Sequence, residues 1–201
     1  NPTKLGYTFA GWSLNNDTPS TTRTIKTGTT GNLTFVATYT PNNNTPYKVE
    51  HYKMNLDGNY PKTPSEVDNL TGTTNTKVTP NVKTYEGFTA PETITQETIK
   101  GDGTTEVVIN YTRNSYEVSY EYDKEYNGAS TLPSAQTVKY EDTITVAADA
   151  TLAGYTFNGW VTVPEKMPAN DVTLTGSFTA NTDTSYTVKH YIEKLDGSYE
   201  L

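Results

Sequence analysis

The sequence predicts a mainly β protein built from several small domains in tandem. Three observations support this: apolar and polar residues alternate in short runs, glycine-containing turns separate these runs, and two different segments each occur twice. Helical signals are limited to one or two turns near Ser65–Leu70 and Met167–Asp171, so α+β is the most helical class that we expect.

The composition excludes several classes of function. The chain contains no cysteine, which excludes disulfide bonds, thiolate zinc sites and cysteine nucleophiles. Only two histidines remain for base catalysis or for binding a metal. Its formal net charge of -8 repels phosphate groups and argues against binding to nucleic acid or anionic lipid. No apolar run is long enough for a membrane span. We therefore expect no nucleic-acid partner, no membrane insertion, no cofactor and no metal.

Two segments repeat along the chain, and we name the repeats type A and type B. In type A, the sequence YKVEHYKMNLDGNY at residues 47–60 returns as YTVKHYIEKLDGSY at residues 186–199. In type B, LGYTFAGW at residues 5–12 returns as AGYTFNGW at residues 153–160. The first type-B copy contains about nine additional residues after its tryptophan, which we expect to form a surface loop.

The order of the repeats predicts four segments. Short polar linkers at residues 42–46 and 181–185 separate type B from type A. Type A continues into type B through residues 112–115 without a linker of this length. The four segments are the end of a type-B repeat (1–42), a complete type-A repeat (45–113), a complete type-B repeat (114–181) and the beginning of a second type-A repeat (184–201).

The type-A repeat is expected to open with a hairpin. Alternation over residues 47–52 directs Tyr47, Val49 and His51 to one face of a strand. Asp57–Gly58 follows as a tight turn, since both residue types tolerate positive φ. A second turn at Lys100–Thr104 and a closing strand at Val107–Tyr111 complete the pattern.

The type-B repeat is also expected to consist of strands. Alternation over Tyr116–Tyr122 predicts its first strand, which resembles the first strand of type A. In the glycine and aromatic motif, Gly6 and Gly11 allow the chain to turn while Trp12 fills a small core. Further strands are predicted at Thr137–Tyr140, Asp142–Val146 and Val172–Phe178.

Residues that are often catalytic or metal-binding receive structural interpretations here. His51 and His190 occupy equivalent type-A positions, and we expect them to pack on a strand face with local hydrogen bonds. The acidic residues between Glu117 and Glu125 lack the spacing of an EF-hand loop and indicate a solvated face. Lysine–asparagine cross-links would suit a cysteine-free chain, but spacing alone does not decide whether one forms. We predict no catalytic residue.

These motifs resemble two known families. The type-B segment GYTFNGW at residues 154–160, followed by MPANDVTL at residues 167–174, resembles the Listeria–Bacteroides repeat, also called the internalin B-repeat. Type A, with its Leu-Asp-Gly turn, YEGF at residues 85–88 and NYT at residues 110–112, is similar to mucin-binding-protein repeats. The resemblance implies tandem β-grasp-like domains in an elongated array, from extracellular, wall-anchored bacterial proteins without catalytic activity.

The leading hypothesis for function is a stalk or spacer of a bacterial surface adhesin, outside the cell or in the cell wall, in contact with neighbouring repeats of its own chain. One alternative is a module that binds a host glycan or protein through exposed tyrosines such as Tyr120 and Tyr122. Another is self-association into fibres by strand exchange between the terminal segments. An enzyme is not expected.

Overall fold

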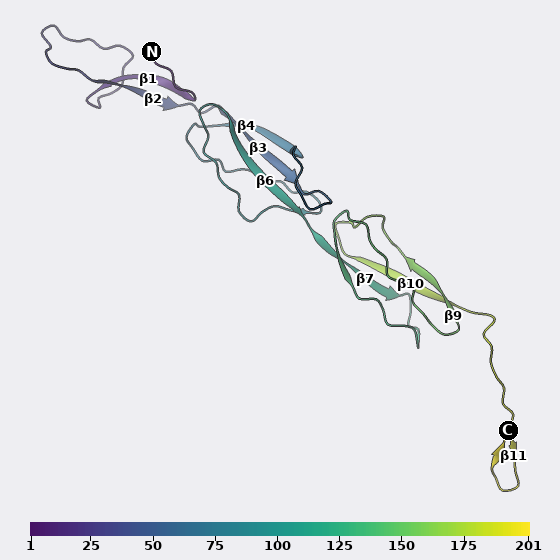
Figure 1. Ribbon diagram of the computed structural model, residues 1–201. Helices are drawn as coiled ribbons and strands as arrows, with labels where there is room; N and C mark the ends of the chain where they lie inside the picture. The colour runs from purple at the N-terminus through teal and green to yellow at the C-terminus, as the bar shows by residue number, and fades with distance from the viewer. The chain divides into compact units, whose positions relative to one another are not determined.

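The computed structural model describes residues 1–201 and consists of strands without any helix (Figure 1). The chain divides into unit 1, Asn1–Asn114, and unit 2, Ser115–Leu201. No helix long and apolar enough to cross a membrane is found. Unit 1 contains β1 (Tyr7–Leu14), β2 (Phe35–Pro41), β3 (Thr45–Lys53), β4 (Glu66–Gly72), β5 (Phe88–Thr89) and β6 (Thr105–Arg113). Unit 2 contains β7 (Ser115–Tyr122), β8 (Gln136–Lys139), β9 (Tyr155–Val161), β10 (Val172–Ala180), β11 (Ile192–Glu193) and β12 (Tyr199–Glu200).

The main sheet of unit 1 has the strand order β4-β3-β6-β5. Strands β3 and β6 are parallel and pair from Tyr47 with Thr105 to Lys53 with Tyr111, and β3 also pairs with β4 in an antiparallel register. Every second residue of β6 is buried, which matches the alternation in its sequence. The core of this sheet consists of Val49, Val78, Ile99, Val107, Ile109 and Tyr111.

The first forty residues form a two-stranded sheet of β1 and β2. A bulge between Phe9 and Gly11 bends β1, and Gly11 has a φ of 138° with the backbone of Ser20 close to its Cα. The additional residues after Trp12 form a mostly exposed loop, as predicted. Arg23 fixes this loop, since its Nε donates a hydrogen bond to the Trp12 carbonyl (2.9 Å).

The main sheet of unit 2 has the same arrangement, with the order β8-β7-β10-β9. The first and last strands of the repeat, β7 and β10, are again parallel neighbours, with Val118 opposite Val172 and Tyr120 opposite Leu174. The core contains Val118, Tyr120, Ile144, Ala150, Trp160, Met167, Val172, Leu174 and Phe178. The two repeat types therefore share one strand topology in which a parallel pair lies at the centre.

Three predicted elements differ in the structure. Residues 66–70 belong to strand β4 and not to a helical turn, because β3 supplies a ladder of backbone hydrogen bonds, whereas one isolated helical turn is costly to nucleate. Met167–Asp171 is also not helical. Its first residue bonds through its backbone to Glu141 and Asp142 (both 2.8 Å), which keeps the chain extended.

The predicted strand at Asp142–Val146 does not form either. The backbone bonds to Met167 are made at the start of this segment, and Ile144 then enters the core from a loop. An apolar residue flanked by polar neighbours produces the same alternation in a loop as in a strand, so periodicity alone did not distinguish the two.

The C-terminal segment forms only the small hairpin of β11 and β12. The turn at Asp196–Gly197 closes it, with Lys194 N–H donating to the Ser198 carbonyl (2.8 Å). Residues 186–191 repeat the sequence pattern of β3, but they are not in a strand and are exposed. The same pattern thus forms a central strand in β3 but not at residues 186–191.

Candidate functional site: the asparagine clasp and the first junction

A set of hydrogen bonds, which we call the clasp, fixes the end of the β1–β2 sheet. Asn42 follows β2 and donates its backbone N–H to the carbonyl of Gly6 (2.9 Å). Thr8 donates its hydroxyl to the side-chain oxygen of the same asparagine (2.7 Å). One asparagine, placed directly after β2, thereby holds the end of β2 against the beginning of β1.

The same clasp recurs at the end of each main sheet. In unit 1, Asn114 donates its N–H to Gly87 (2.8 Å) and accepts the hydroxyl of Thr89 (2.6 Å). In unit 2, Asn181 donates its N–H to Gly154 (2.9 Å) and accepts the hydroxyl of Thr156 (2.7 Å). Both repeat types therefore end in the same set of hydrogen bonds, although their sequences differ elsewhere.

Each clasp glycine has a φ that favours glycine. The φ values of Gly6, Gly87 and Gly154 are 75°, 75° and 78°. In each case the following aromatic residue donates its N–H to the carbonyl three residues before it, at 3.0 to 3.1 Å. This turn directs the clasp threonine toward the asparagine.

The clasp was not among the features predicted from the sequence, although the sequence contains a signal for it. The triplet of glycine, tyrosine or phenylalanine, and threonine occurs at residues 6–8, 87–89 and 154–156. An asparagine ends a strand-forming run at positions 42, 114 and 181. The triplet and the asparagine are common to types A and B, whose sequences differ elsewhere.

Within unit 1, the first clasp also contacts the next sheet. The carbonyl of Asn42 accepts the N–H of Thr74 (2.9 Å), and the hydroxyls of Thr74 and Thr45 are hydrogen-bonded (2.6 Å) and buried. A methyl group on Gly6 would overlap the backbone of Gly101, and one on Gly101 would overlap the carbonyl of Leu5. We call these contacts the first junction, because they join the β1–β2 sheet to the β3–β6 sheet.

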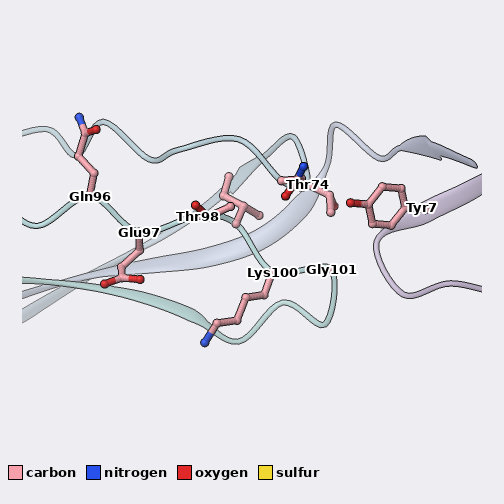
Figure 2. Close-up of a pocket in the computed structure, with 9 residues that line it drawn as sticks. Tyr7, Thr74, Gln96, Glu97, Thr98, Lys100 and Gly101 are labelled. Carbon is pink, nitrogen blue, oxygen red and sulfur yellow. The ribbon is translucent and has the colours of Figure 1, made fainter.

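A pocket of about 320 Å³ lies beside the first junction. Figure 2 shows the Tyr7 hydroxyl directed toward Thr74, while the side chain of Lys100 extends away from Tyr7. The pocket lining is mostly polar, with both Glu97 and Lys100. Nothing in this lining forms an arrangement typical of catalysis, and no group of three or more histidine, aspartate or glutamate side chains is placed to hold a metal ion.

His51 lies fully buried in a hydrogen-bond network of unit 1. Its Nδ1 is 2.9 Å from the Tyr111 hydroxyl, and its Nε2 is 3.2 Å from the Asp68 carboxylate. The Tyr111 oxygen also accepts the backbone N–H of Lys83 (3.0 Å). A neutral imidazole with its hydrogen on Nε2 satisfies all three contacts, since Tyr111 can then donate to Nδ1. His51 therefore has the local hydrogen bonds that its sequence position predicted, whereas the same expectation for His190 is wrong, since His190 is exposed and lies outside any strand.

Lys83 forms an ion pair with two carboxylates at the edge of this network. Its Nζ is 2.6 Å from Asp68 and 2.6 Å from Glu66. Hydrogen bonds from Lys83 are the largest cause that lowers the pKa of both carboxyl groups, and these bonds in turn raise the pKa of Lys83. Lys83, Glu66 and Asp68 therefore form a network of charged groups beside the buried His51.

Comparison with known proteins identifies the family. The Listeria-Bacteroides repeat domain matches residues 1–38 and 116–189, which is more than half of the chain. The chain belongs to the Listeria–Bacteroides repeat family. Both matched ranges lie mainly in the type-B segments, which are therefore the Listeria–Bacteroides repeats of this chain.

Among solved structures, the chain is similar to Streptococcal High Identity Repeats in Tandem (SHIRT) domains 3-4 from a cell surface protein. The sequence identity is 21% and the TM-score is 0.25. The match covers 66% of this chain and 96% of the streptococcal one.

The two tyrosines that we considered as ligand contacts lie inside the complete Listeria–Bacteroides repeat. Tyr120 is only 8% exposed, and its hydroxyl accepts hydrogen bonds from the backbone of Ala147 (3.0 Å) and the amide of Gln136 (3.2 Å). Tyr122 is half-buried, stacks on Trp160 and donates to the Ser130 carbonyl (2.9 Å). The assumption that both are exposed was wrong, because their side chains lie on the face of β7 that packs into the core of unit 2. Their contact with a ligand stays a prediction.

Proposed function

We propose that this chain is a non-catalytic repeat region of an extracellular bacterial surface protein, in which it serves as a stalk or spacer. Its membership of the Listeria–Bacteroides repeat family supports this proposal. The division into segments 1–42, 45–113, 114–181 and 184–201, with residues 45–113 as a mucin-binding-protein-like repeat, is part of the same proposal.

The observation that carries the proposal is the first junction together with its clasp. A spacer has to transmit orientation from one repeat to the next, which requires contacts that limit bending between them. Asn42 bonds backward to Gly6 and Thr8 and forward to Thr74, so one residue connects two successive sheets. The close approach of Gly6 and Gly101 adds a contact that admits no side chain.

The test is a distance measurement between the two sheets of unit 1. Because the chain has no cysteine, spin labels attach only to cysteines introduced in place of Val36 on β2 and Val108 on β6, both exposed. We expect a narrow distance distribution in the labelled parent and a broader one after Gly101→Ala, whose methyl group would overlap the carbonyl of Leu5. Asn42→Ala should have a smaller effect, because it removes only the side-chain bond to Thr8 and keeps the backbone bonds to Gly6 and Thr74.

Asn43→Ala is the matched control, because Asn43 is the exposed neighbour of Asn42 and has no clasp contact. This control should keep the narrow distribution. A broad distribution in the labelled parent chain would contradict the spacer function, since the junction would then not restrict bending.

A further inference from the structure

The strand by which the chain enters a repeat is the parallel neighbour of the strand by which it leaves. In residues 45–113 the chain enters through β3 and leaves through β6, and in residues 114–181 it enters through β7 and leaves through β10. Both pairs are hydrogen-bonded in parallel. The point of entry and the point of exit therefore lie at opposite ends of one strand pair.

Tension along the chain loads such a pair in shear. It pulls the first strand toward its N-terminal end and the last strand toward its C-terminal end. The hydrogen bonds of a parallel ladder are evenly spaced along the strands, so they share this load and have to break together. When two paired strands are instead pulled apart from one end, their hydrogen bonds break one after another.

Side chains add further links between β3 and β6. Lys48 of β3 lies opposite Glu106 of β6, and its Nζ is 2.7 Å from the carboxylate. On the other face, Nδ1 of His51 in β3 is 2.9 Å from the hydroxyl of Tyr111 in β6. His51, Tyr111 and the neighbouring Val49 are buried, so this face of the pair is closed to water, which competes for hydrogen bonds.

The corresponding pair in unit 2 is shorter. Five residues of β7 lie opposite five residues of β10, against seven such pairs between β3 and β6. Its side-chain links contain no ion pair: the hydroxyls of Ser119 and Thr173 are 3.0 Å apart, and Thr175 donates to the Glu121 carboxylate at 3.3 Å. Fewer hydrogen bonds share the load between β7 and β10, so these strands should separate at a lower force.

We propose that this chain bears tension, and that the parallel strand pair of each complete repeat is the mechanical clamp that resists it. The clamp of residues 45–113 withstands more force than the clamp of residues 114–181. This inference rests on the proposed spacer function and deepens it, because a spacer between a cell surface and an attached target is pulled along its chain. Forced unfolding depends on the rate of unfolding, so the clamp is a property distinct from the free energy of unfolding.

Single-molecule pulling of the intact chain in optical tweezers tests the first clamp. Because the chain has no cysteine, DNA handles attach only to introduced cysteines. In the shear variant, cysteines replace Asn44 and Thr112, which are exposed and lie just before β3 and near the end of β6. In the peel variant, they replace Asn44 and the exposed Thr104 just before β6, so that β3 and β6 are pulled apart from one end.

The same ladder is loaded in both variants, and only the direction of the load differs. At equal loading rate we expect a force about two- to sevenfold higher in shear than in peel, with the seven residue pairs that share the load setting the upper limit. Urea unfolding of both variants without handles is the control. Equal free energies of unfolding are expected, since all three substituted residues are exposed.

A third variant compares the two clamps. Cysteines in place of Ser115 and Ala180, exposed residues at the outer ends of β7 and β10, load the second clamp in shear. We expect it to unfold at a lower force than the pair at Asn44 and Thr112.

Two results would overturn the proposal. One is equal force in the shear and peel variants, and the other is a higher force for β7 and β10 than for β3 and β6. Neither result contradicts the spacer function, which depends on the first junction and is measured by the distance distribution. A broad distance distribution together with a high force in shear would instead contradict the spacer function and leave the clamp in place.

Discussion

At the scale of single residues, the Tyr111 hydroxyl is the centre of the buried network in unit 1. It contacts the imidazole of His51 and the backbone N–H of Lys83, and Tyr111 itself is fully buried. Tyr111→Phe leaves both partners without their hydrogen bond in a site that water does not reach. We expect it to lower the free energy of unfolding of unit 1 by about 1–3 kcal/mol in urea titrations.

Tyr60→Phe is the control for this prediction, because the Tyr60 hydroxyl makes one long and exposed hydrogen bond to Thr112 (3.3 Å). Its effect should be within the error of the measurement. Equal stabilities of the parent and Tyr111→Phe would show that the network contributes nothing to folding.

The ion pair of Lys83 predicts a dependence of stability on pH. The folded-state pKa values of Glu66 and Asp68 are lowered, first of all by the hydrogen bonds from Lys83, from ordinary values of 4.5 and 3.8. Their stabilising contribution is therefore fully present above these ordinary values and is lost as the pH falls through the lower folded values. In Lys83→Met, the loss of stability should be larger at pH 7 than at about pH 3.

Urea unfolding at the two pH values measures this difference. Lys62→Met is the control, since Lys62 is exposed and forms no ion pair. A loss of stability in Lys83→Met that is the same at both pH values would show that the carboxylates are not the groups through which Lys83 acts.

At the scale of structural elements, the three clasps allow a matched comparison of glycine substitutions. Gly6→Ala and Gly154→Ala both place a methyl group at a φ near 75°, which costs about 1–2 kcal/mol in each case. Only the first also overlaps the backbone of Gly101, whereas the nearest atom to a methyl on Gly154 is the Thr184 hydroxyl at 3.5 Å. We therefore expect Gly6→Ala to be the more destabilising of the two.

Hydrogen exchange of β1 and of β9 reads out the two substitutions separately. Faster exchange of β1 in Gly6→Ala than of β9 in Gly154→Ala is the expected result. Equal acceleration of hydrogen exchange in β1 and β9 would indicate that backbone strain alone causes the loss of stability. The contact with Gly101 would then not stabilise the first junction.

At the scale of the whole molecule, each unit has a buried cluster of its own. Ile109 and Tyr111 belong to the cluster of unit 1, and Trp160 and Leu174 to that of unit 2. Because stability in a repeat protein is close to a sum of separate contributions, damage to one core should remain local. Ile109→Ala should destabilise unit 1 by about 2–5 kcal/mol and leave unit 2 unchanged.

Hydrogen exchange followed by mass spectrometry distinguishes the units in a single sample. Peptides from β3 and β6 should exchange faster in Ile109→Ala, and peptides from β7 and β10 should keep the rates of the parent chain. A parallel loss of protection in β7 and β10 would contradict the independence that the stalk function requires.

The sequence alone indicated features that are local or repeated. Alternation predicted the strands β3, β6, β7 and β10, since a half-buried strand places every second side chain on one face. Sequence identity between copies indicated the repeats and the family resemblance, because equivalent residues occupy equivalent places in each copy. The structural role of His51 followed from the same two signals.

Only the tertiary structure decided which strands became neighbours. The parallel contact of β7 with β10 joins residues more than fifty positions apart. The packing of Ile144 and Met167 on one face of this sheet buries Tyr120, whose face alternation alone left open to solvent or to the core. The tertiary structure also brings Asn42, Asn114 and Asn181 to their glycine and threonine partners. An alternating run specifies two faces of a strand but neither its neighbours nor which face is covered, since these depend on chain segments distant in sequence.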